Sequence, residues 1–182
     1  NLDYFFKKID ELSFKELFKD CNYVTDVFSK LNNYILEKTD DKKECFAECS
    51  KFVCLSNNYI IGNNTKISDF VVIEGPVVIG NNVNIMPGTY IRPYSIIGDN
   101  CVIGFGSEIK HSIIMDNAKV ASNTFVGDSI IGYKTRVGSG TIIANRRFDQ
   151  GNVVLKNGNE VIDLKKDFFG SVIGDSTRLG AN

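Results

Sequence analysis

The sequence predicts a mainly β protein: a parallel β-helix of hexapeptide repeats that follows an N-terminal helical segment and contains one hairpin excursion. Two observations lead to this fold class. Large aliphatic residues recur every six positions over more than 80 residues, and short Gly-Asn corners recur every 18. Neither an α-helix, with a period of about 3.6, nor an ordinary strand, with a period of about 2, produces this spacing. A hexapeptide β-helix does, because each flat face contributes one inward aliphatic side chain and then turns.

Residues 1–50 are expected to be helical. Apolar residues between positions 2 and 9 share one helical face, and Ser13 with Glu16 has the spacing of a capping box for a second helix. That helix is expected to reach residue 35, with Asn22 and Tyr23 as the point where it could break, and a charged turn at 40–44. The phenylalanines of this segment are expected to pack the helices on the β-region or on a neighbouring subunit. A recognition surface for another protein is the alternative.

The repeat region is predicted to span residues 51–182. Its six-residue spacing is strict up to Ile109, shortens by one residue before Ile114 and again before Ile131, and returns late in the chain. The side chains predicted to point inward are those of Ile61, Ile67, Ile73, Ile79, Ile85, Ile91, Ile97, Ile103, Ile109, Ile114, Val120, Val126, Ile131, Val137, Ile143, Ile173 and Leu179.

Glycine-led corners follow the inward residue at Gly62, Gly80 and Gly98. Their spacing of 18 residues equals three hexapeptides, which is one triangular coil. Gly and Asn tolerate a positive φ angle, so both are predicted to suit the tight corners. Met115 occupies the glycine position of the next coil.

The repeat is interrupted at residues 145–170. Residues 153–155 and 161–164 flank Asn157-Gly158, a pattern typical of a β-hairpin around an Asn-Gly turn. Because insertions in a solenoid commonly form its binding surface, this excursion is expected beside the functional cleft.

Composition excludes several function classes. A net charge of −1 gives no reason to expect a nucleic-acid or membrane-surface partner, and no apolar run reaches the length of a membrane span. Five cysteines cannot all pair within one chain. Cys45 and Cys49, four residues apart in a chain with one histidine, are poorly spaced for zinc, so no metal site is expected. This cysteine usage favours a cytoplasmic protein.

Four motifs indicate a family: Tyr90-Ile91-Arg92-Pro93, Glu108-Ile109-Lys110, Val126-Gly127-Asp128 and the run at residues 137–145. With them, residues 91–182 resemble the left-handed β-helix acetyltransferase domain of the bifunctional N-acetylglucosamine-1-phosphate uridylyltransferase/glucosamine-1-phosphate acetyltransferases and their archaeal sugar-1-phosphate nucleotidylyltransferase relatives. The resemblance implies left-handed coils, a homotrimer, acetyl-CoA as co-substrate and an amino-sugar phosphate as acceptor.

The resemblance also implies site residues. Arg92 and Lys110 match the family's ligands of the sugar phosphate, and Asn145 matches a substrate contact. Ser139 and Gly140 match backbone positions beside the acetyl-CoA thioester. A planar Arg fork and a Lys point charge together suit a phosphate group.

Further substrate-binding candidates are Glu108, Arg136 and Arg146. Glu108 lies beside Lys110 and could position it, Arg136 stands where the family has a substrate-side asparagine, and Arg146 opens the excursion together with Arg147. Asp128 suits either the orientation of a site group or a coil corner.

One departure from the family pattern concerns catalysis. The family's histidine base matches Ser122, and its neighbouring tyrosine matches Phe125. A Ser hydroxyl cannot replace an imidazole with a pKa of about 6.5, and loss of a general base costs about 10²–10⁴-fold in rate. His111 follows Lys110 directly. Because strand neighbours point to opposite faces, these two side chains are not expected to share a pocket.

Two functions therefore remain open. The first is acetyl transfer from acetyl-CoA to a glucosamine-1-phosphate-like acceptor, in a cleft between subunits of a trimer. The second is a catalytically impaired relative that binds a sugar phosphate or nucleotide-sugar, or a trimeric scaffold.

Overall fold

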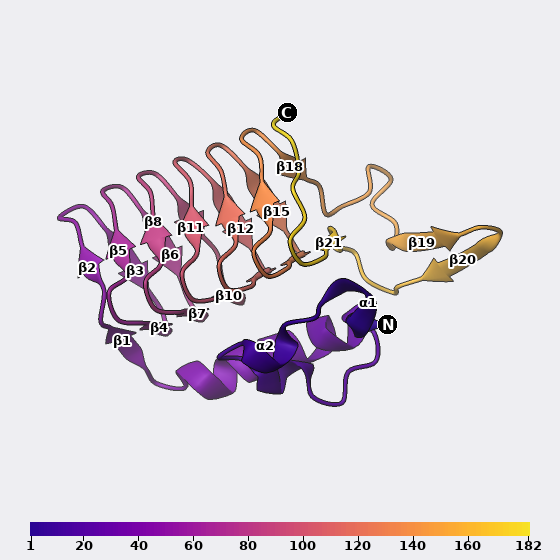
Figure 1. The fold of residues 1–182 in the computed structure, drawn as a ribbon, viewed down its shortest axis with the longest axis horizontal. Helices are drawn as coiled ribbons and strands as arrows, with labels where there is room; N and C mark the ends of the chain where they lie inside the picture. The colour runs from indigo at the N-terminus through magenta and orange to yellow at the C-terminus, as the bar shows by residue number, and fades with distance from the viewer.

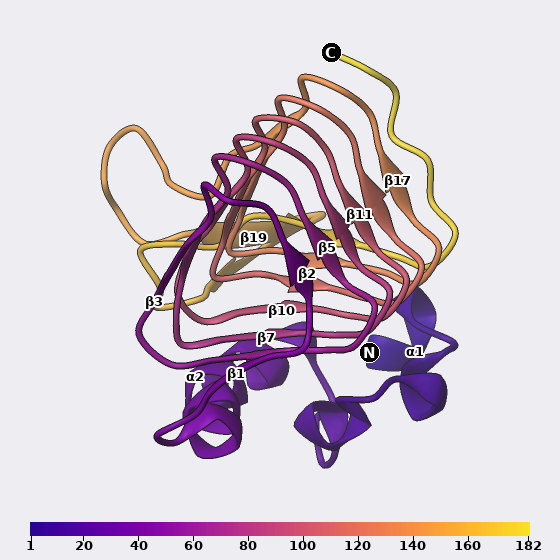
Figure 2. The same cartoon turned by 90° about the vertical axis from the view of Figure 1, so that its left-hand side faces the viewer.

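A computed structural model describes residues 1–182, apart from the side chain of Asn157, and shows a parallel β-solenoid (Figure 1). Three parallel sheets form the faces of a triangular prism (Figure 2). In Figure 2 the chain passes counterclockwise from β1 through β2 to β3 as the coils recede from the viewer, so the solenoid is left-handed. The mainly β fold class is thus confirmed.

The strands of each sheet come from successive coils. Sheet A contains β1 (Lys43–Cys45), β4 (Tyr59–Ile61), β7 (Val77–Ile79), β10 (Ser95–Ile97), β13 (Ile113–Ile114), β16 (Ile130–Ile131) and β21 (Val172–Ile173). Sheet B contains β2 (Glu48–Cys49), β5 (Lys66–Ile67), β8 (Asn84–Ile85), β11 (Val102–Ile103), β14 (Lys119–Val120) and β17 (Arg136–Val137). Sheet C contains β3 (Cys54–Ser56), β6 (Val72–Glu74), β9 (Tyr90–Ile91), β12 (Glu108–Lys110), β15 (Phe125–Gly127) and β18 (Ile142–Ile143).

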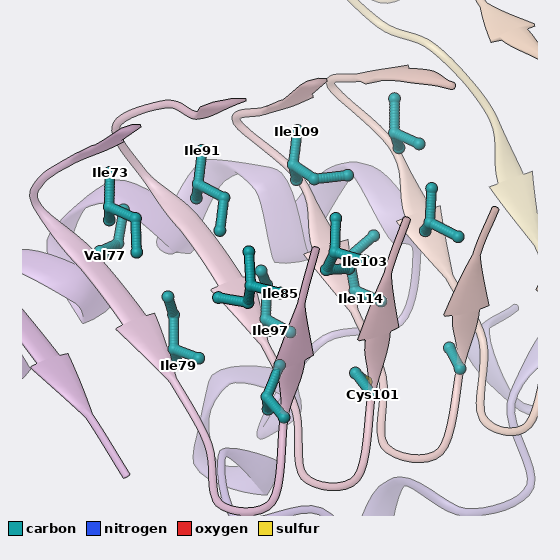
Figure 3. Packing of buried hydrophobic residues seen from close by; sticks show 14 of the residues in the cluster. Ile73, Val77, Ile79, Ile85, Ile91, Ile97, Cys101, Ile103, Ile109 and Ile114 are labelled. Atoms are coloured by element: carbon teal, nitrogen blue, oxygen red, sulfur yellow. The ribbon is translucent and has the colours of Figure 1, made fainter. Parts of the chain in front are cut away.

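The inward side chains at six-residue spacing form the core of the solenoid. Its predicted members from Ile61 to Ile143 are buried in one cluster, and Ile173 and Leu179 pack against that cluster while partly buried. Figure 3 shows part of this cluster, including Ile73, Ile91 and Ile109, stacked along the axis inside the coils. Ile79 pairs with Ile97 at a register of 18, and Ile97 pairs with Ile114 at 17, so each shortened repeat removes one residue from a coil without moving the inward side chain.

The corner glycines have a different role from the predicted one. Positive φ angles occur at the last Asn of the corner, for example Asn82 at 55°, and not at the leading glycine. A Cβ at Gly80 would lie 2.2 Å from Asp99 Oδ1, which accepts the Asn81 N–H at 2.8 Å. Glycine is therefore required for close approach of the next coil's side chain. At Met115 the next coil has Tyr133 at the matching position, in place of the Asn or Asp whose side chain approaches the corner glycines of other coils.

The N-terminal segment is less regular than predicted. It consists of α1 (Leu2–Phe5), the 3₁₀ turns η1 (Ile9–Glu11) and η2 (Lys15–Phe18), and α2 (Val24–Thr39). Ser13 and Glu16 do not cap a helix; α2 begins after a break at the expected position, where the side chain of Asp26 accepts from the backbone N–H of the N-cap residue Tyr23. Hydrogen bonds from the N–H groups of Asn22 and Tyr23 to Asp26 explain why the helix begins there.

This segment covers the outer surface of sheet A (Figure 2). Four of its phenylalanines are buried in a cluster with outward apolar residues that sit in register on sheet A, among them Ile96, Ile113 and Ile130. Sheet A is thus buried on both faces, which explains the two consecutive isoleucines in several of its strands.

Strand formation begins earlier than the predicted boundary between residues 50 and 51. β1 starts at Lys43, within the stretch interpreted as a charged turn, and its residues pair with β4. Strand pairing with the following coil therefore overrides the polar composition of these residues.

The excursion contains the expected hairpin, which projects beyond the last coils (Figure 1). β19 (Val154–Asn157) pairs antiparallel with β20 (Glu160–Asp163), so the two-residue turn is Gly158-Asn159, one residue later than predicted. Gly158 supplies a positive φ of 60° in this turn.

The helices of the described residues are too short or too polar to span a membrane.

Candidate functional site

The matched residues gather mainly on the outer surface of sheet C. β9, β12, β15 and β18 are consecutive neighbours there, with Glu108 in register with Tyr90 and with Phe125. Arg92 follows β9 directly, and its N–H donates to Ile109 O at 2.8 Å. The strict register therefore stacks Arg92 and Lys110 on adjacent strands, about 5 Å apart along the sheet.

Arg92 forms an ion pair at the more open part of this surface. Its Nη1 lies 2.9 Å from Glu108 Oε1, and the two side chains are 38% and 34% exposed. The guanidinium also lies over the ring of Tyr90, at 5.9 Å from its centroid. Tyr90 Oη donates to Glu74 Oε2 at 2.5 Å, and this hydrogen bond raises the pKa of Tyr90. Glu108 thus orients Arg92 while leaving part of the guanidinium in solvent.

Asp128 is the centre of a denser cluster at the corner between sheets C and A. Its Oδ2 accepts hydrogen bonds from Lys110 Nζ at 2.9 Å and from Asn145 Nδ2 at 2.5 Å, while its Oδ1 lies 2.7 Å from His111 Nδ1. Burial by itself raises the pKa of this carboxyl, but the hydrogen bonds from His111, Lys110 and Asn145 outweigh it, so the pKa of Asp128 is lowered. Asp128 is therefore an anion that fixes three candidate side chains.

The expectation that Lys110 and His111 point to different pockets is wrong. Both contact the carboxylate of Asp128. β12 ends at Lys110, and His111 has a φ of 46°, so it belongs to the corner and not to the strand. The alternation of side chains ends where the extended backbone ends.

His111 is held on both ring nitrogens. Nδ1 faces Asp128, and Nε2 lies 2.8 Å from Asn32 Oδ1 on α2. The ring packs between Phe28 and Tyr94, with centroid distances of 6.0 and 6.3 Å. With both nitrogens engaged, the geometry assigns His111 to the attachment of α2 to the solenoid and does not leave a nitrogen free to accept a substrate proton.

The end of the excursion returns over this cluster. Phe168 lies under two cations, Lys110 Nζ at 4.0 Å and the Arg146 guanidinium at 5.2 Å from its ring centroid. The Phe169 N–H donates to Asn145 O and the Gly170 N–H to Asp128 O, both at 2.9 Å. Through the ring of Phe168, these contacts place Arg146 near Lys110. Arg147 instead pairs with Asp149 in the excursion.

Gly127 and Gly170 make this close return possible. A Cβ at Gly170 would lie 2.1 Å from Gly127 O, and a Cβ at Gly127 would lie 2.6 Å from Asn145 Nδ2. Any larger residue at either position would displace the excursion or the Asn145 amide.

The residues matched to the reacting end of the family site lie elsewhere on the solenoid. Ser122, Ser139 and Gly140 stack at the corner between sheets B and C, where the Gly140 N–H donates to Ser122 O at 2.9 Å. That amide is therefore already used within the corner. Up to about 20 Å of chain separates Ser122 from Asp128, given six residues of extended backbone. Arg136 lies on sheet B and does not join Arg92 and Lys110 within one chain.

Two contributions were not identified from the sequence: the contact of Asn32 and the ring of Phe168. Of the two interpretations left open for Asp128, both hold, because it orients site groups and lies at a coil corner. Asn32 and His111 are 79 positions apart, so no local pattern could relate them. Gly127 and Gly170 are sequence signals for a close approach at this corner.

Two alternative site types receive no support from the described part of the chain. It contains no group of three or more His, Cys, Asp or Glu side chains placed to hold a metal ion. An apolar pocket of about 650 Å³ lies between the N-terminal segment and the excursion, but its lining, which includes Phe5, Leu155 and Phe169, offers no charged side chain for chemistry.

Comparisons with known proteins point in the same direction as the motifs. The bifunctional protein GlmU of Methanococcus maripaludis is 38% identical over 174 residues, which cover 95% of this chain and 41% of that protein. GlmU of Methanococcus vannielii is 44% identical over 79 residues, 43% of this chain and 19% of that protein. The bifunctional sugar-1-phosphate nucleotidylyltransferase/acetyltransferase of Sulfurisphaera tokodaii is 37% identical over 80 residues, 44% and 20% of the two chains.

The chain thus spans less than half the length of these curated relatives. A family model covers the later coils together with the excursion. Because the model of the GMPPB C-terminal domain matches residues 73–182, more than half of the sequence, the chain belongs to the GMPPB C-terminal domain family.

Proposed function

We propose that the chain transfers an acetyl group from acetyl-CoA to the amine of an amino-sugar phosphate, with a glucosamine-1-phosphate-like acceptor. The observation that carries this proposal is the pair of cations on sheet C: Arg92 held by Glu108 and Lys110 held by Asp128. The relative from Sulfurisphaera tokodaii, whose name includes an acetyltransferase activity, supports the reaction type.

Each group has a defined role in this proposal. Arg92 and Lys110 bind the phosphate of the acceptor, Glu108 and Asp128 orient them, and Asn145 and Arg146 border the sugar. The acyl donor lies along the corner formed by Ser139 and Gly140 of a neighbouring subunit, in a cleft between subunits of the proposed trimer. The acceptor nitrogen attacks the thioester carbonyl, a C–N bond forms, the C–S bond breaks, the nitrogen loses a proton and the CoA sulfur leaves as a thiol.

A second candidate function follows from the absence of the family's histidine base at position 122. Ser122 stands at the matched base position, and both nitrogens of His111 are engaged. A catalytically impaired protein that binds a sugar phosphate or nucleotide-sugar on sheet C, or a trimeric scaffold, agrees with these two facts. An enzyme without a positioned imidazole would use the fraction of acceptor that is already a free amine, so its rate should rise with pH.

A thiol-release assay with acetyl-CoA and glucosamine-1-phosphate separates the two functions. We expect slow turnover that rises with pH, and a gain of about 10-fold or more from Ser122→His, because a general base contributes about 10²–10⁴-fold. Absence of turnover at high protein concentration, in both wild type and Ser122→His, would refute acetyl transfer to this acceptor.

Binding of the acceptor tests the phosphate site independently of turnover. Arg92→Ala should weaken binding of glucosamine-1-phosphate by about 10-fold or more, because a charge-assisted hydrogen bond contributes about 1.5–3 kcal/mol. Lys66→Ala, on sheet B, is the matched control and should leave this affinity unchanged. Equal affinities for wild type and Arg92→Ala in calorimetry would show that sheet C does not bind the phosphate.

We also propose that the chain forms a homotrimer in the cytoplasm. Large apolar side chains are exposed along the corner between sheets B and C, where Phe52 and Phe70 stack at 5.6 Å and Phe105 is 54% exposed. Such a strip is typical of an interaction surface. All five cysteines are free thiols, in agreement with a reducing compartment. Light scattering of wild type and Phe70→Lys tests the assembly: a monomeric wild type would contradict it.

A further inference from the structure

The outer surface of sheet B contains a group of cations, among them the substrate-binding candidate Arg136, to which the roles proposed above for acetyl transfer assign no contact. Lys119 on β14 is in register with Arg136 on β17, and Arg136 forms a parallel bridge with Arg178. All three side chains are exposed. Successive strands lie about 4.8 Å apart, so the three cations form a column about 10 Å long. We refer to Lys119, Arg136 and Arg178 as the sheet B column.

Within the part of the chain that the structure describes, this column has no carboxylate partner. The ion pairs of the described residues include none with Lys119, Arg136 or Arg178, whereas the sheet C cations Arg92 and Lys110 are each paired. The corner acids of neighbouring coils are used elsewhere: Asp116 accepts the Asp99 N–H, and Asp175 accepts those of Tyr133 and Lys7. Like charges in register on neighbouring strands are destabilising, so the column costs stability unless an anion binds.

A pocket lies against the column. Its volume is about 320 Å³, and it is lined by Asn117, Lys119, Lys134, Thr135, Arg136 and Arg178. Lys134 adds a fourth cation, whose Nζ lies 5.3 Å from the Tyr133 ring centroid. Ligand pockets commonly have about 300–1,000 Å³. This one is at the lower limit and has no acidic lining residue, which suits a small polyanion.

We propose that the sheet B column is a binding site for a linear diphosphate group, either free or as part of a nucleotide. Three cations spread over about 10 Å extend beyond one phosphate, and a diphosphate provides oxygens on two phosphorus atoms for Arg forks and Lys ammonium groups. The small pocket accepts the diphosphate, and a nucleoside would lie outside it. This inference goes beyond acetyl transfer and does not depend on it.

Pyrophosphate is the probe that tests the site, by calorimetry on the intact chain at low salt. We expect pyrophosphate to bind, inorganic phosphate to bind at least 10-fold more weakly, and Lys119→Gln and Arg136→Gln to weaken pyrophosphate binding about 10-fold each. Lys66→Gln is the matched control. Lys66 is an exposed lysine on the outer surface of sheet B, at the same register position as Lys119 but three strands earlier, so it lies outside the sheet B column. It should leave the affinity unchanged.

Several outcomes would overturn the site. These are no pyrophosphate binding by wild type, equal affinity in the column variants, an equal loss in Lys66→Gln, or an affinity for inorganic phosphate that matches that for pyrophosphate. Loss of pyrophosphate binding in Arg92→Ala but not in Arg136→Gln would place the anion on sheet C instead. ADP and CoA identify the source: tighter binding than pyrophosphate indicates a nucleotide, and equal binding indicates the diphosphate alone.

An unfolding assay provides a second readout for variants that fold. Saturating pyrophosphate should raise the Tm of wild type and of Lys66→Gln, because a ligand that binds only the folded state stabilises it by mass action. The same addition should leave the Tm of the Lys119→Gln/Arg178→Gln variant unchanged; an equal rise there would also contradict the site.

Discussion

Sheets B and C both carry cations at the same strand spacing, but only the cations of sheet C have carboxylate partners. On sheet C, Arg92 has Glu108 and Lys110 has Asp128 as a carboxylate partner. On sheet B, Lys119, Arg136 and Arg178 stand in register, and no ion pair of the described residues includes them. This difference shows two arrangements of cations on one solenoid. On sheet C, carboxylates of the chain hold the cations in place. On sheet B, the repulsion between like charges is reduced only when an external anion binds.

The largest expected effect is the unfolding of the solenoid, which would remove the surfaces of sheets B and C together. Ile85 is fully buried in the axial stack, and Ile85→Asp would place an unpaired charge there. The cost of such burial exceeds several kcal/mol, comparable to a total stability of about 5–15 kcal/mol, so we expect no cooperative unfolding transition in circular dichroism. Asn84→Asp, on the exposed side of the same strand, is the control and should fold. A normally folded Ile85→Asp protein would contradict the axial stack.

The next prediction removes a carboxylate partner from sheet C, so that its cations become unpaired like those of sheet B. Asp128→Asn removes the carboxylate that Lys110 and His111 share, and the side chain of Asp128 is only 8% exposed. We expect a loss of about 1–3 kcal/mol in the free energy of unfolding, because buried polar groups lose their partner. Glu108→Gln removes the partner of Arg92 at a half-exposed site and should cost about 0–1 kcal/mol. Similar losses from the two variants in urea titrations would contradict the greater importance of the corner cluster.

The acid dependence of stability isolates the same carboxyl. The pKa of Asp128 is lowered from its ordinary value of 3.8, so its contribution to stability is fully present above that value and is lost as the pH falls through the lowered pKa. The stability difference between wild type and Asp128→Asn should therefore be constant down to about pH 5 and shrink on acidification to pH 3. Thermal melts across this range measure it. A difference that grows on acidification would mean that the pKa is raised.

The smallest effect gives sheet B the countercharge that it lacks. Arg136→Glu places a carboxylate between Lys119 and Arg178, and cross-strand pairs of opposite charge contribute about 0.2–1 kcal/mol. We expect a Tm above that of wild type at low salt and a smaller gain at high salt, where screening weakens surface pairs. Arg136→Gln should give an intermediate Tm. If Arg136→Glu were less stable than Arg136→Gln, the column would not be a site of like-charge repulsion.

The candidate site was predictable where it follows the repeat. Arg92, Glu108 and Lys110 occupy fixed positions relative to inward residues, so their common surface follows from the six-residue spacing. The corner cluster was not predictable in this way. The positive φ of His111 ends the strand alternation, and the contact of Asn32 depends on how α2 lies on sheet A.

The N-terminal segment shows the same limit. Its apolar residues predicted helices that pack on the β-region, but the 3₁₀ turns and the start of α2 at Val24 depend on local caps and on the shape of sheet A. The first strand at Lys43 depends on a partner 16 residues later, and nothing in its polar composition indicates it.

The sequence by itself determined the solenoid, because one inward aliphatic residue per six positions can be buried only if every coil repeats the same path. It also determined the positions of Arg92 and Lys110, which are tied to that path. Only the tertiary structure decided which cations have partners. Charge pairing at the site depends on side chains that meet across 16 to 18 residues, as Arg92 meets Glu108 across 16 and Lys110 meets Asp128 across 18. Such contacts are set by the stacking of coils and not by local sequence.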